Sequence, residues 1–451
     1  MIYDEQLGIF AKYLPIPLYI VGGYTRNFLV DGSLSKDVDV CSSMPAEQMA
    51  REVQSFGGKC VATYKRTGTV VFTLGDKKFE YTTFRKDGYT AGGFHTPDKV
   101  QFTDDIVEDA LRRDFKCNAV YYDLKKDKFV DPLSGIEDVK NRVLDTVKQP
   151  KEVFCHDGLR LMRLARFSGE LGFTPTPKVI ESARVFADNI KDVSVERVWT
   201  ELKYILSADT KHAFSPKDGH YRALKVLDQT RVLDRILPDL AQGRGLEQRK
   251  DYHDYDVLQH TLKCVLYAPL EVRLSALLHD VAKPCLMLKN GNAYEHEKVG
   301  AIMAKEILKG LKADTNCIQK TARIIKAHML DMKGDMRENK VRAFMLENVD
   351  ILYQILDLKQ ADFSACKDDL SVCPTVEKWQ RIYEKMKVDG TPFSLADLKV
   401  NSADVISAGF SGAEIGKTLS SLLKLCQDYP QKNQREYLLC KILEYKESKK
   451  G

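Results

Sequence analysis

The chain has 451 residues, of which 44% are hydrophobic and 29% are charged, and its formal net charge is +5. This balance is typical of a globular protein, and the length suits two to four domains of about 100–200 residues each. The small net charge excludes a strongly basic nucleic-acid coat protein, although it allows a local basic face.

The cysteines and the N-terminus indicate a reducing compartment. Eleven cysteines are scattered without a CxxC pair, which predicts free thiols and not a disulfide framework. The first residues, MIYDEQLGIF, lack the basic region and apolar core of a secretory signal. No apolar run approaches the roughly 18–20 residues that span a bilayer. We therefore expect a cytoplasmic protein with no membrane partner.

The first 150 residues predict a mixed α/β block with a small sheet. Short strands are expected at 18–23, 37–43 and 128–135, and two β-branched strands joined by a Gly-Asp turn at 67–84. Helical patterns cover 45–56 and 104–113.

After about residue 150, apolar residues recur almost everywhere at helical spacing. The fold class is therefore a multidomain chain with a mixed α/β head followed by all-α regions. We expect a head at 1–148, a helical neck at 149–212, a helical body at 213–366 and a helical tail at 367–451.

One constellation in the head suits phosphate chemistry. Gly22 and Gly23 follow a strand, and Arg26 follows at the start of a helix. Backbone N–H groups at such glycines can approach a triphosphate closely. Asp37 and Asp39, two apart on an expected strand, would point to the same face. Two converging carboxylates suit divalent cations that carry phosphates.

Taken singly these features are most often an ordinary turn and solvated carboxylates. Together they resemble the polymerase-β nucleotidyltransferase superfamily, and more narrowly the family of bacterial class II tRNA CCA-adding enzymes and poly(A) polymerases. The resemblance implies a polymerase-β-like head in which Asp37 and Asp39 hold Mg²⁺. Thr67-Gly68-Thr69 is similar to a second family motif, and Glu80 stands where a third active-site acid is found. The segment RRDFKCNAV is similar to a nucleotide-binding motif through Arg112, Arg113, Asp114, Phe115, Asn118 and Ala119.

The segment HDGLRLMRLARF resembles the family's EDxxR motif, through Asp157 and Arg160. On one helix these two would be neighbours on the same face. Cytosine and adenine each present an amine donor beside a ring-nitrogen acceptor, which suits a carboxylate and a guanidinium. Uracil and guanine present the reverse order. The pair would therefore admit CTP and ATP; the plainer interpretation is a helix-surface salt bridge. Arg163 and Arg166, further along the helix, are candidates for triphosphate or RNA contacts.

The sequence departs from the family at three places. His156 replaces the Glu of EDxxR, Thr25-Arg26-Asn27 replaces VRD, and Gly93-Phe94-His95 replaces an Asp-x-Arg segment before a proline. The switch from C to A depends in the family on that loop and helix, so a specialised CC- or A-adding enzyme is an alternative. His156 also adds a candidate pH dependence between about 5 and 8.

A second constellation lies in the body. His260, the adjacent His279 and Asp280, and Asp362 follow the order H…HD…D, and ALLHDVAKP resembles the HD phosphohydrolase superfamily. Imidazoles and carboxylates suit a divalent metal: Mg, Mn, Ni or Fe. A second metal site would use His296 and His328.

The resemblance implies untemplated transfer of CMP and AMP from CTP and ATP to a tRNA 3′ end, with release of pyrophosphate. The implied partners are tRNA, CTP and ATP, without DNA, and the chain would be a monomer or homodimer. An additional HD phosphohydrolase activity stays open. So do three rivals: a poly(A) polymerase, an HD phosphohydrolase with a silent head, and a non-catalytic RNA-binding protein.

Overall fold

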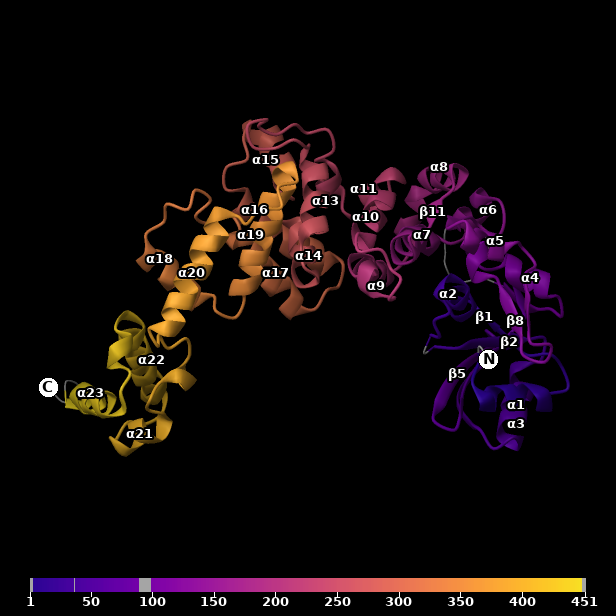
Figure 1. Ribbon diagram of the computed structural model, residues 1–451, viewed down its shortest axis with the longest axis horizontal. Helices are drawn as coiled ribbons and strands as arrows, with labels where there is room; N and C mark the ends of the chain where they lie inside the picture. Colours follow the sequence, from indigo (N-terminus) through magenta and orange to yellow (C-terminus); the bar gives the residue numbers. More distant parts are fainter. Residues whose placement is uncertain (1–2, 36, 89–98, 448–451) are drawn as a thin grey trace.

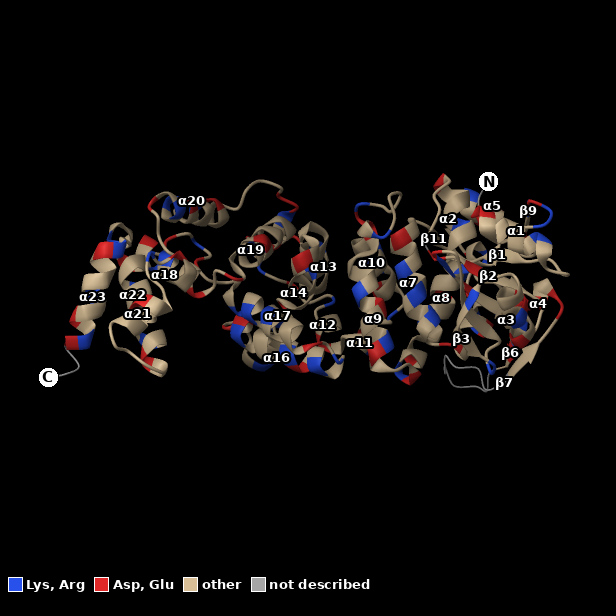
Figure 2. Cartoon of the chain, turned by 90° about the horizontal axis from the view of Figure 1, so that it is seen from below, with Lys and Arg blue, Asp and Glu red and all other residues tan. Residues whose placement is uncertain are grey.

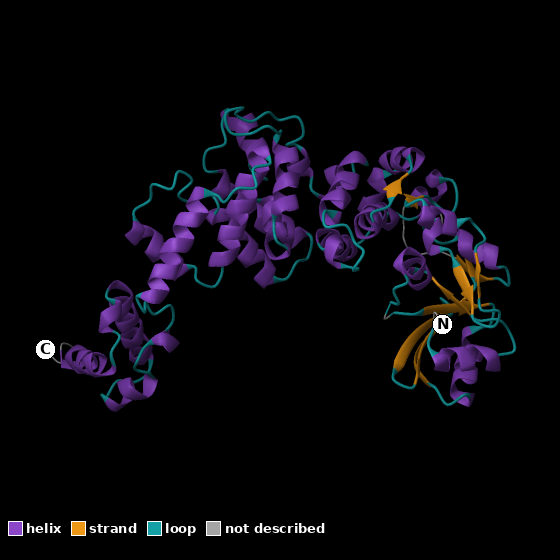
Figure 3. Cartoon of the chain, in the orientation of Figure 1, coloured by secondary structure: helices purple, strands orange, loops and turns teal. Residues whose placement is uncertain are grey.

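The computed structural model describes residues 3–35, 37–88 and 99–447. The chain forms an elongated arch, with the head at one end and the C-terminal helices at the other (Figure 1). The strands are confined to the head and its junction with the neck, and helices make up the rest (Figure 3). This arrangement confirms the expected multidomain fold, a mixed α/β head followed by helical regions. Among the described residues, no helix is long and apolar enough to cross a membrane.

The head is built on a seven-stranded sheet of order β3-β4-β5-β2-β1-β8-β9. Its strands are β1 (Tyr19–Val21), β2 (Asp39–Ser42), β3 (Lys59–Tyr64), β4 (Thr69–Leu74), β5 (Lys77–Thr83), β8 (Tyr121–Asp123) and β9 (Lys128–Val130). All neighbours are antiparallel except β2 and β5, which run parallel and place Asp39 opposite Glu80. A hairpin of β6 (Arg85–Gly88) and β7 (Lys99–Phe102) extends from β5.

Helices cover the sheet and lead to the neck. They are α1 (Glu5–Tyr13), α2 (Gly23–Asp31), α3 (Ala46–Ser55), α4 (Ile106–Leu111), α5 (Gly135–Lys140) and α6 (Pro150–His156). Aromatic residues such as Phe72, Phe79 and Tyr81 are fully buried in the core on one side of the sheet. The expected strands and helices of this region are confirmed, whereas α1, β3 and β8 were not expected.

The neck and body form a continuous helical stack. Their main helices are α7 (Leu159–Leu171), α8 (Pro177–Val185), α9 (Val195–Leu206), α10 (Gly219–Gln229), α13 (Val257–Tyr267), α14 (Arg273–Leu278), α15 (Lys283–Asn290), α16 (His296–Gly310), α17 (Thr315–Ala327) and α19 (Leu352–Lys367). One hydrophobic core runs from the head through the neck into the body. Hence the neck is anchored on both sides, which fixes the position of α7 relative to the head.

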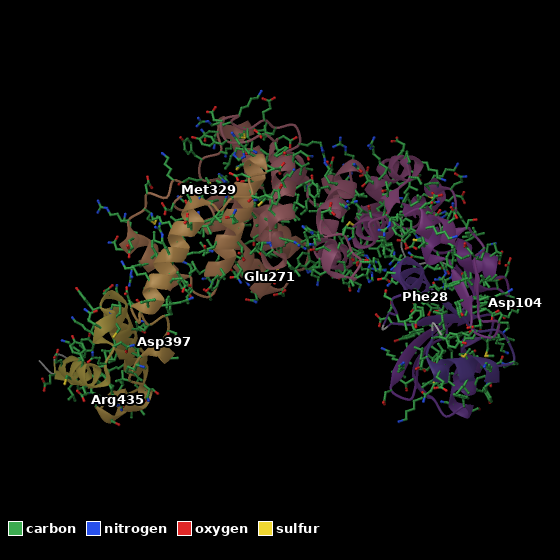
Figure 4. The ribbon with its side chains drawn as sticks, viewed as in Figure 1. Phe28, Asp104, Glu271, Met329, Asp397 and Arg435 are labelled. Carbon is green, nitrogen blue, oxygen red and sulfur yellow. The ribbon has the colours of Figure 1, made fainter. Side chains whose placement is uncertain are left out.

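The tail contains α20 (Pro374–Val388), α21 (Ser402–Ser407), α22 (Ala413–Asp428) and α23 (Arg435–Glu447). Asp397 and Arg435 mark this end of the arch, far from Phe28 and Asp104 in the head (Figure 4). The buried Trp379 on α20 packs in one cluster with Val341 and Leu352 of the body. The expected boundary at residue 366 therefore crosses a shared core, and the expected domain limits stay a proposal.

Candidate functional site

A cavity of about 900 Å³ lies between the head and α7. It is lined by almost every residue that the sequence predicted for the nucleotidyl-transfer site. These are Gly22, Gly23, Arg26, Asp37, Asp39, Arg113, Asp114, Asn118, Asp157, Arg160, Arg163 and Arg166. Residues up to 144 positions apart are therefore brought to one site, and basic residues recur along α7 (Figure 2).

The glycine pair forms the sharp turn from β1 into α2. Gly22 has φ +85, which favours glycine, and a Cβ added there would lie 3.4 Å from Oδ2 of Asp39. Gly23 begins α2. Backbone N–H groups at the start of a helix suit an anionic ligand.

The two aspartates lie at the entrance to β2. Asp39 is the first residue of the strand, but Asp37 precedes it in a bend, so the expectation that both stand on one strand was wrong. Both nevertheless line the cavity. Burial, then Glu80 on the neighbouring strand and Asp37, raise the pKa of Asp39 to about 6. This crowding of carboxylates suits a cation. Glu80 is not among the lining residues and lies opposite Asp39 on the neighbouring strand.

Asp157 and Arg160 approach each other across a helix break. Asp157 ends α6 in an extended conformation, and α7 starts at Leu159, so the expectation of one shared helix face was wrong. Oδ1 of Asp157 accepts the Leu159 N–H at 3.0 Å, and its Oδ2 lies 3.5 Å from Nε of Arg160. Arg160 also donates to the backbone oxygen of Arg112 at 2.7 Å. Because these contacts fix both side chains, the cavity wall presents an acceptor beside a donor.

A buried network holds the central cationic groups. Arg26 donates through Nη1 to Asn118 at 2.6 Å, and Asn118 donates to Asp114 at 2.9 Å. Arg163 donates to Oδ2 of Asp114 through Nε at 2.8 Å and Nη2 at 2.5 Å. Burial alone would raise the pKa of Asp114, but Arg163 and Asn118 hold it below its ordinary value. Asp114 therefore positions Arg163 and Asn118 and stays ionised.

Two predicted arginines are held by other side chains. Arg113 donates to Oδ2 of the buried Asp109 at 3.1 Å, and Arg112 donates to Oδ1 of Asp109 at 2.7 Å. Arg166 lies 2.8 Å from Oε2 of Glu201 on α9, so it ties α7 to the neck although it also lines the cavity.

Several cavity residues were missed by the sequence reasoning. Phe167 on α7 has the guanidinium groups of three arginines over its ring, at 4.5–5.1 Å from its centroid. Lys211 and His212 follow α9 in irregular structure, where no motif marks them. Arg85 and Asp87 come from the hairpin strand β6. The sequence offered only one signal for these residues, which is the spacing of basic and aromatic residues along α7.

The departures from the family pattern fall partly outside this cavity. His156 is half-buried at the end of α6 and is not among the lining residues. Burial, then Arg160 and Lys148, lower its pKa, so the neutral imidazole prevails at pH 7. Gly93-Phe94-His95 lie outside the described residues, and Asn27 accepts from Arg26 Nη2 at 2.8 Å.

The second predicted site is assembled in the body. Nε2 of His260 lies 3.0 Å from Asp362, and Nε2 of His279 lies 3.2 Å from Asp280. Nε2 of His296 lies 3.3 Å from Asp280 and 3.3 Å from Nε2 of His328. All six of these residues are buried, and His296 and Asp362 are slightly less buried than the other four.

This cluster, hereafter the HD cluster (His260, His279, Asp280, His296, His328 and Asp362), fits a divalent cation. His279, His296 and His328 each place Nδ1 within hydrogen-bond distance of the carbonyl three residues earlier, at 2.8, 2.9 and 2.6 Å. This bond places the proton on Nδ1 and leaves the Nε2 lone pairs facing one another. The two oxygens of the buried Asp280 face Nε2 of His279 at 3.2 Å and Nε2 of His296 at 3.3 Å, and Nζ of Lys283 lies 2.7 Å from Oδ2. Converging imidazole lone pairs beside carboxylates are an arrangement that a cation satisfies.

Comparisons with known proteins agree with this geometry. Models of three families match: the Poly A polymerase head domain at residues 18–145, the probable RNA and SrmB-binding site of polymerase A at 172–243, and the HD domain at 253–408. A curated CCA-adding enzyme of Lactobacillus helveticus is 31% identical over 302 residues, which cover 64% of this chain and 70% of that enzyme. The chain belongs to the CCA-adding enzyme family of tRNA nucleotidyltransferases.

Two further proteins are similar to the chain, one in sequence and one in fold. An A-adding tRNA nucleotidyltransferase of Deinococcus radiodurans is 27% identical over 377 residues, covering 80% of each chain. The solved structure of the Bacillus stearothermophilus CCA-adding enzyme with CTP has the same fold, with a TM-score of 0.63, 21% identity, and coverage of 99% of this chain and 98% of that one. In the present chain, the HD cluster lies within residues 253–408, the segment that matches the HD domain.

Proposed function

We propose that the chain adds CMP and AMP to the 3′ end of tRNA, using CTP and ATP without a nucleic-acid template. The observation that carries this proposal is the Asp157–Arg160 pair, which lines the same cavity as Gly22, Asp37 and Asp39. A cavity that holds both a base-reading pair and a triphosphate site can select a nucleotide by the hydrogen-bonding edge of its base.

The pair distinguishes bases by the order of donor and acceptor. The Asp157 carboxylate accepts from the exocyclic amine of cytosine or adenine, and Arg160 donates to the adjacent ring nitrogen. Uracil and guanine would set a carbonyl oxygen against the carboxylate and an N–H against the guanidinium. Both groups are only 10–13% exposed, so the unpaired partners would lose water without compensation.

The remaining cavity residues bind the triphosphate and the cation. Asp37 and Asp39 are the ligands that we propose for Mg²⁺, which when bound would activate the attacking hydroxyl and stabilise the leaving pyrophosphate. Gly22 and Gly23 offer backbone N–H groups to the triphosphate, and Arg26 and Arg163 supply positive charge. Glu80, opposite Asp39 on β5, would add negative charge beside the cation.

The tRNA would be bound by the helical neck, body and tail through shape and phosphate contacts. This accounts for the lack of a sequence-reading motif. The names of the relatives are compatible with two different products for this chain, because one relative is called a CCA-adding enzyme and another an A-adding tRNA nucleotidyltransferase. A monomer or homodimer in the cytoplasm, without DNA or membrane, stays our expectation.

Single-nucleotide incorporation tests the proposed function. Three tRNA transcripts, ending before CCA, after CC and after CCA, are each incubated with Mg²⁺ and one or two nucleotides. Growth of the first by three residues with CTP and ATP together, and none with UTP or GTP, is the expected result. Extension of only one incomplete form would show a specialised CC- or A-adding enzyme, and long tails made from ATP alone would show a poly(A) polymerase.

A second proposed function rests on the HD cluster. Its converging Nε2 atoms and the Asp280 carboxylate are the ligand types that bind Mg²⁺, Mn²⁺, Ni²⁺ or Fe²⁺, and such an ion supports phosphoester hydrolysis. We expect the intact chain to hydrolyse bis(p-nitrophenyl) phosphate with one of these ions. His279→Ala should abolish hydrolysis and leave nucleotide addition intact, while Asp39→Asn should do the reverse. Hydrolysis that persists in His279→Ala would refute this second function.

A further inference from the structure

Phe167 lies beside the cavity, at the place where the head meets helix α7 of the neck. The guanidinium carbons of Arg26, Arg163 and Arg166 lie over its ring, at 5.1, 5.0 and 4.5 Å from the centroid. Arg26 belongs to α2 of the head, whereas the other two arginines belong to α7. Phe115 of the head packs edge-on against the same ring, with centroids 5.9 Å apart, and Phe167 is only 5% exposed. The ring is therefore fixed between the head and three cationic groups.

The two arginines of α7 are each paired with a carboxylate at their N–H edge. Nε and Nη2 of Arg163 both donate to Oδ2 of Asp114. Nε of Arg166 lies 2.8 Å from Oε2 of Glu201. A guanidinium forms such bonds in its own plane, so its face stays available to an aromatic ring. The ring can thus hold these arginines without occupying the N–H groups that would bind an anion.

Arg26 differs from the other two because its side chain donates to neutral groups. It is buried, and its hydrogen bonds go to the amide oxygens of Asn27 and Asn118. Burial lowers the pKa of Arg26, and the neighbouring charge of Arg166 acts in the same direction. A Cβ added to Gly23, in the turn from β1 into α2, would lie 3.6 Å from Nη2 of Arg26. The aromatic ring and an anion at the glycine turn are the two groups that can stabilise this buried charge.

We propose that Phe167 is a positioning residue that gathers Arg26 of the head and Arg163 of α7 around the triphosphate of the incoming nucleotide. This role rests on the proposed nucleotide addition and refines it. Three like charges around one ring repel one another, and the attraction of each guanidinium to that ring offsets the repulsion. Because the arginines come from both the head and the neck, the ring also sets the triphosphate site relative to Asp157, which precedes α7.

Phe167→Leu removes the aromatic face and keeps an apolar side chain, so it tests this role through KM. On a tRNA transcript that ends before CCA, we expect KM for CTP to rise about tenfold and kcat to change by less than about threefold. The preference for CTP over UTP should stay, because it depends on Asp157 and Arg160. Phe167→Met, which also lacks the ring, should behave like Phe167→Leu. Phe167→Tyr keeps the ring and should have a KM within about twofold of the unchanged protein.

Binding of inorganic triphosphate with Mg²⁺ separates this role from the nucleotide addition, because it needs neither a base nor a reaction. By calorimetry, we expect its Kd to rise about tenfold in Phe167→Leu. Phe173→Leu is the matched control, since Phe173 is buried in the same core but is not among the cavity's lining residues, and it should change neither KM nor Kd.

Circular dichroism shows that each variant is folded. An unchanged Kd in folded Phe167→Leu and Phe167→Met, or a loss in Phe167→Tyr as large as in Phe167→Leu, would overturn the role of Phe167. If the unchanged protein binds triphosphate but extends no transcript, the proposed nucleotide addition is refuted, and the Kd values still decide the role of the ring.

Discussion

Asp157 lies in the break that follows α6 and Arg160 lies in the first turn of α7, and their side chains approach to 3.5 Å. One carboxylate thus caps α7 through the Leu159 N–H and also pairs with the guanidinium. The helix break turns the acceptor toward the cavity, so the local backbone and the proposed base selection depend on the same residue.

The buried Asp109 should be the main electrostatic support of the cavity's arginines. It is fully buried and accepts from Arg112, Arg113 and the Tyr121 hydroxyl. Asp109→Asn leaves the two guanidinium groups without their counter-charge, so we expect a loss of roughly 3 kcal/mol in the unfolding free energy of the head. Urea unfolding followed by near-ultraviolet circular dichroism measures this loss. The exposed neighbour Asp104→Asn should change it by less than about 0.5 kcal/mol.

The difference in unfolding free energy between wild type and Asp109→Asn should depend on pH in a defined way. Burial alone would raise the pKa of Asp109, but Arg113 and Arg112 outweigh it and lower the pKa to about 2. A carboxyl with a lowered pKa contributes stability above its unfolded pKa of about 3.9 and loses it as the pH falls through the folded value. The difference between wild type and Asp109→Asn should therefore shrink from about pH 4 toward pH 2. A difference that grows in this range would contradict the assignment.

Removing either proposed Mg²⁺ ligand should stop nucleotide addition without affecting the body. Asp37→Asn and Asp39→Asn each remove a negative charge where the cation would bind, and we expect a rate loss of roughly 1,000-fold or more, because such ions contribute several kcal/mol. Primer extension on a tRNA transcript measures it. Asp76→Asn, in the exposed turn between β4 and β5, is the matched control and should extend normally. Normal extension by Asp39→Asn would exclude the proposed metal site.

His156 should affect the change from C to A more than the first addition. It lies outside the cavity lining, but its titration is coupled to Arg160. His156→Glu brings a second carboxylate toward Arg160, in competition with Asp157, whereas His156→Gln stays neutral. For His156→Glu, we expect product ladders with an altered ratio of CC to CCA ends, while the first CMP addition is nearly unchanged. For His156→Gln, we expect an unaltered ratio. Identical ladders from all three proteins would end this hypothesis.

Much of the site could be predicted because its residues lie in short segments with strong chemical types. Gly22 and Asp39 were predicted from local spacing, and Asp114 and Arg160 from the resemblance of their motifs to the family; the structure brings all four to one cavity. The helix break at Asp157 could not be predicted, because Gly158 stands within an otherwise continuous helical pattern. A Cβ at Gly158 would lie 2.1 Å from the Asn189 oxygen, so tertiary packing and not the local sequence requires this glycine.

The parts that were missed depend on contacts distant in sequence. Lys211 and His212 reach the cavity only because the neck folds back on the head, and their segment has no periodic pattern. In contrast, the HD cluster was predicted from the order of His260, His279, Asp280 and Asp362 and its resemblance to the HD superfamily, although His279 and Asp280 lie in the turn after α14.

Nucleotide selection by Asp157→Asn tests directly whether Asp157 reads the base. The amide oxygen can still cap α7, while the amide nitrogen becomes a donor where the carboxylate accepted. We would measure kcat/KM for CTP and UTP on a tRNA transcript that ends before CCA, beside an Asp192→Asn control on the exposed neck surface. We expect the CTP preference over UTP to fall by at least about tenfold in Asp157→Asn alone, which corresponds to about 1.4 kcal/mol. An unchanged preference would show that Asp157 does not read the base.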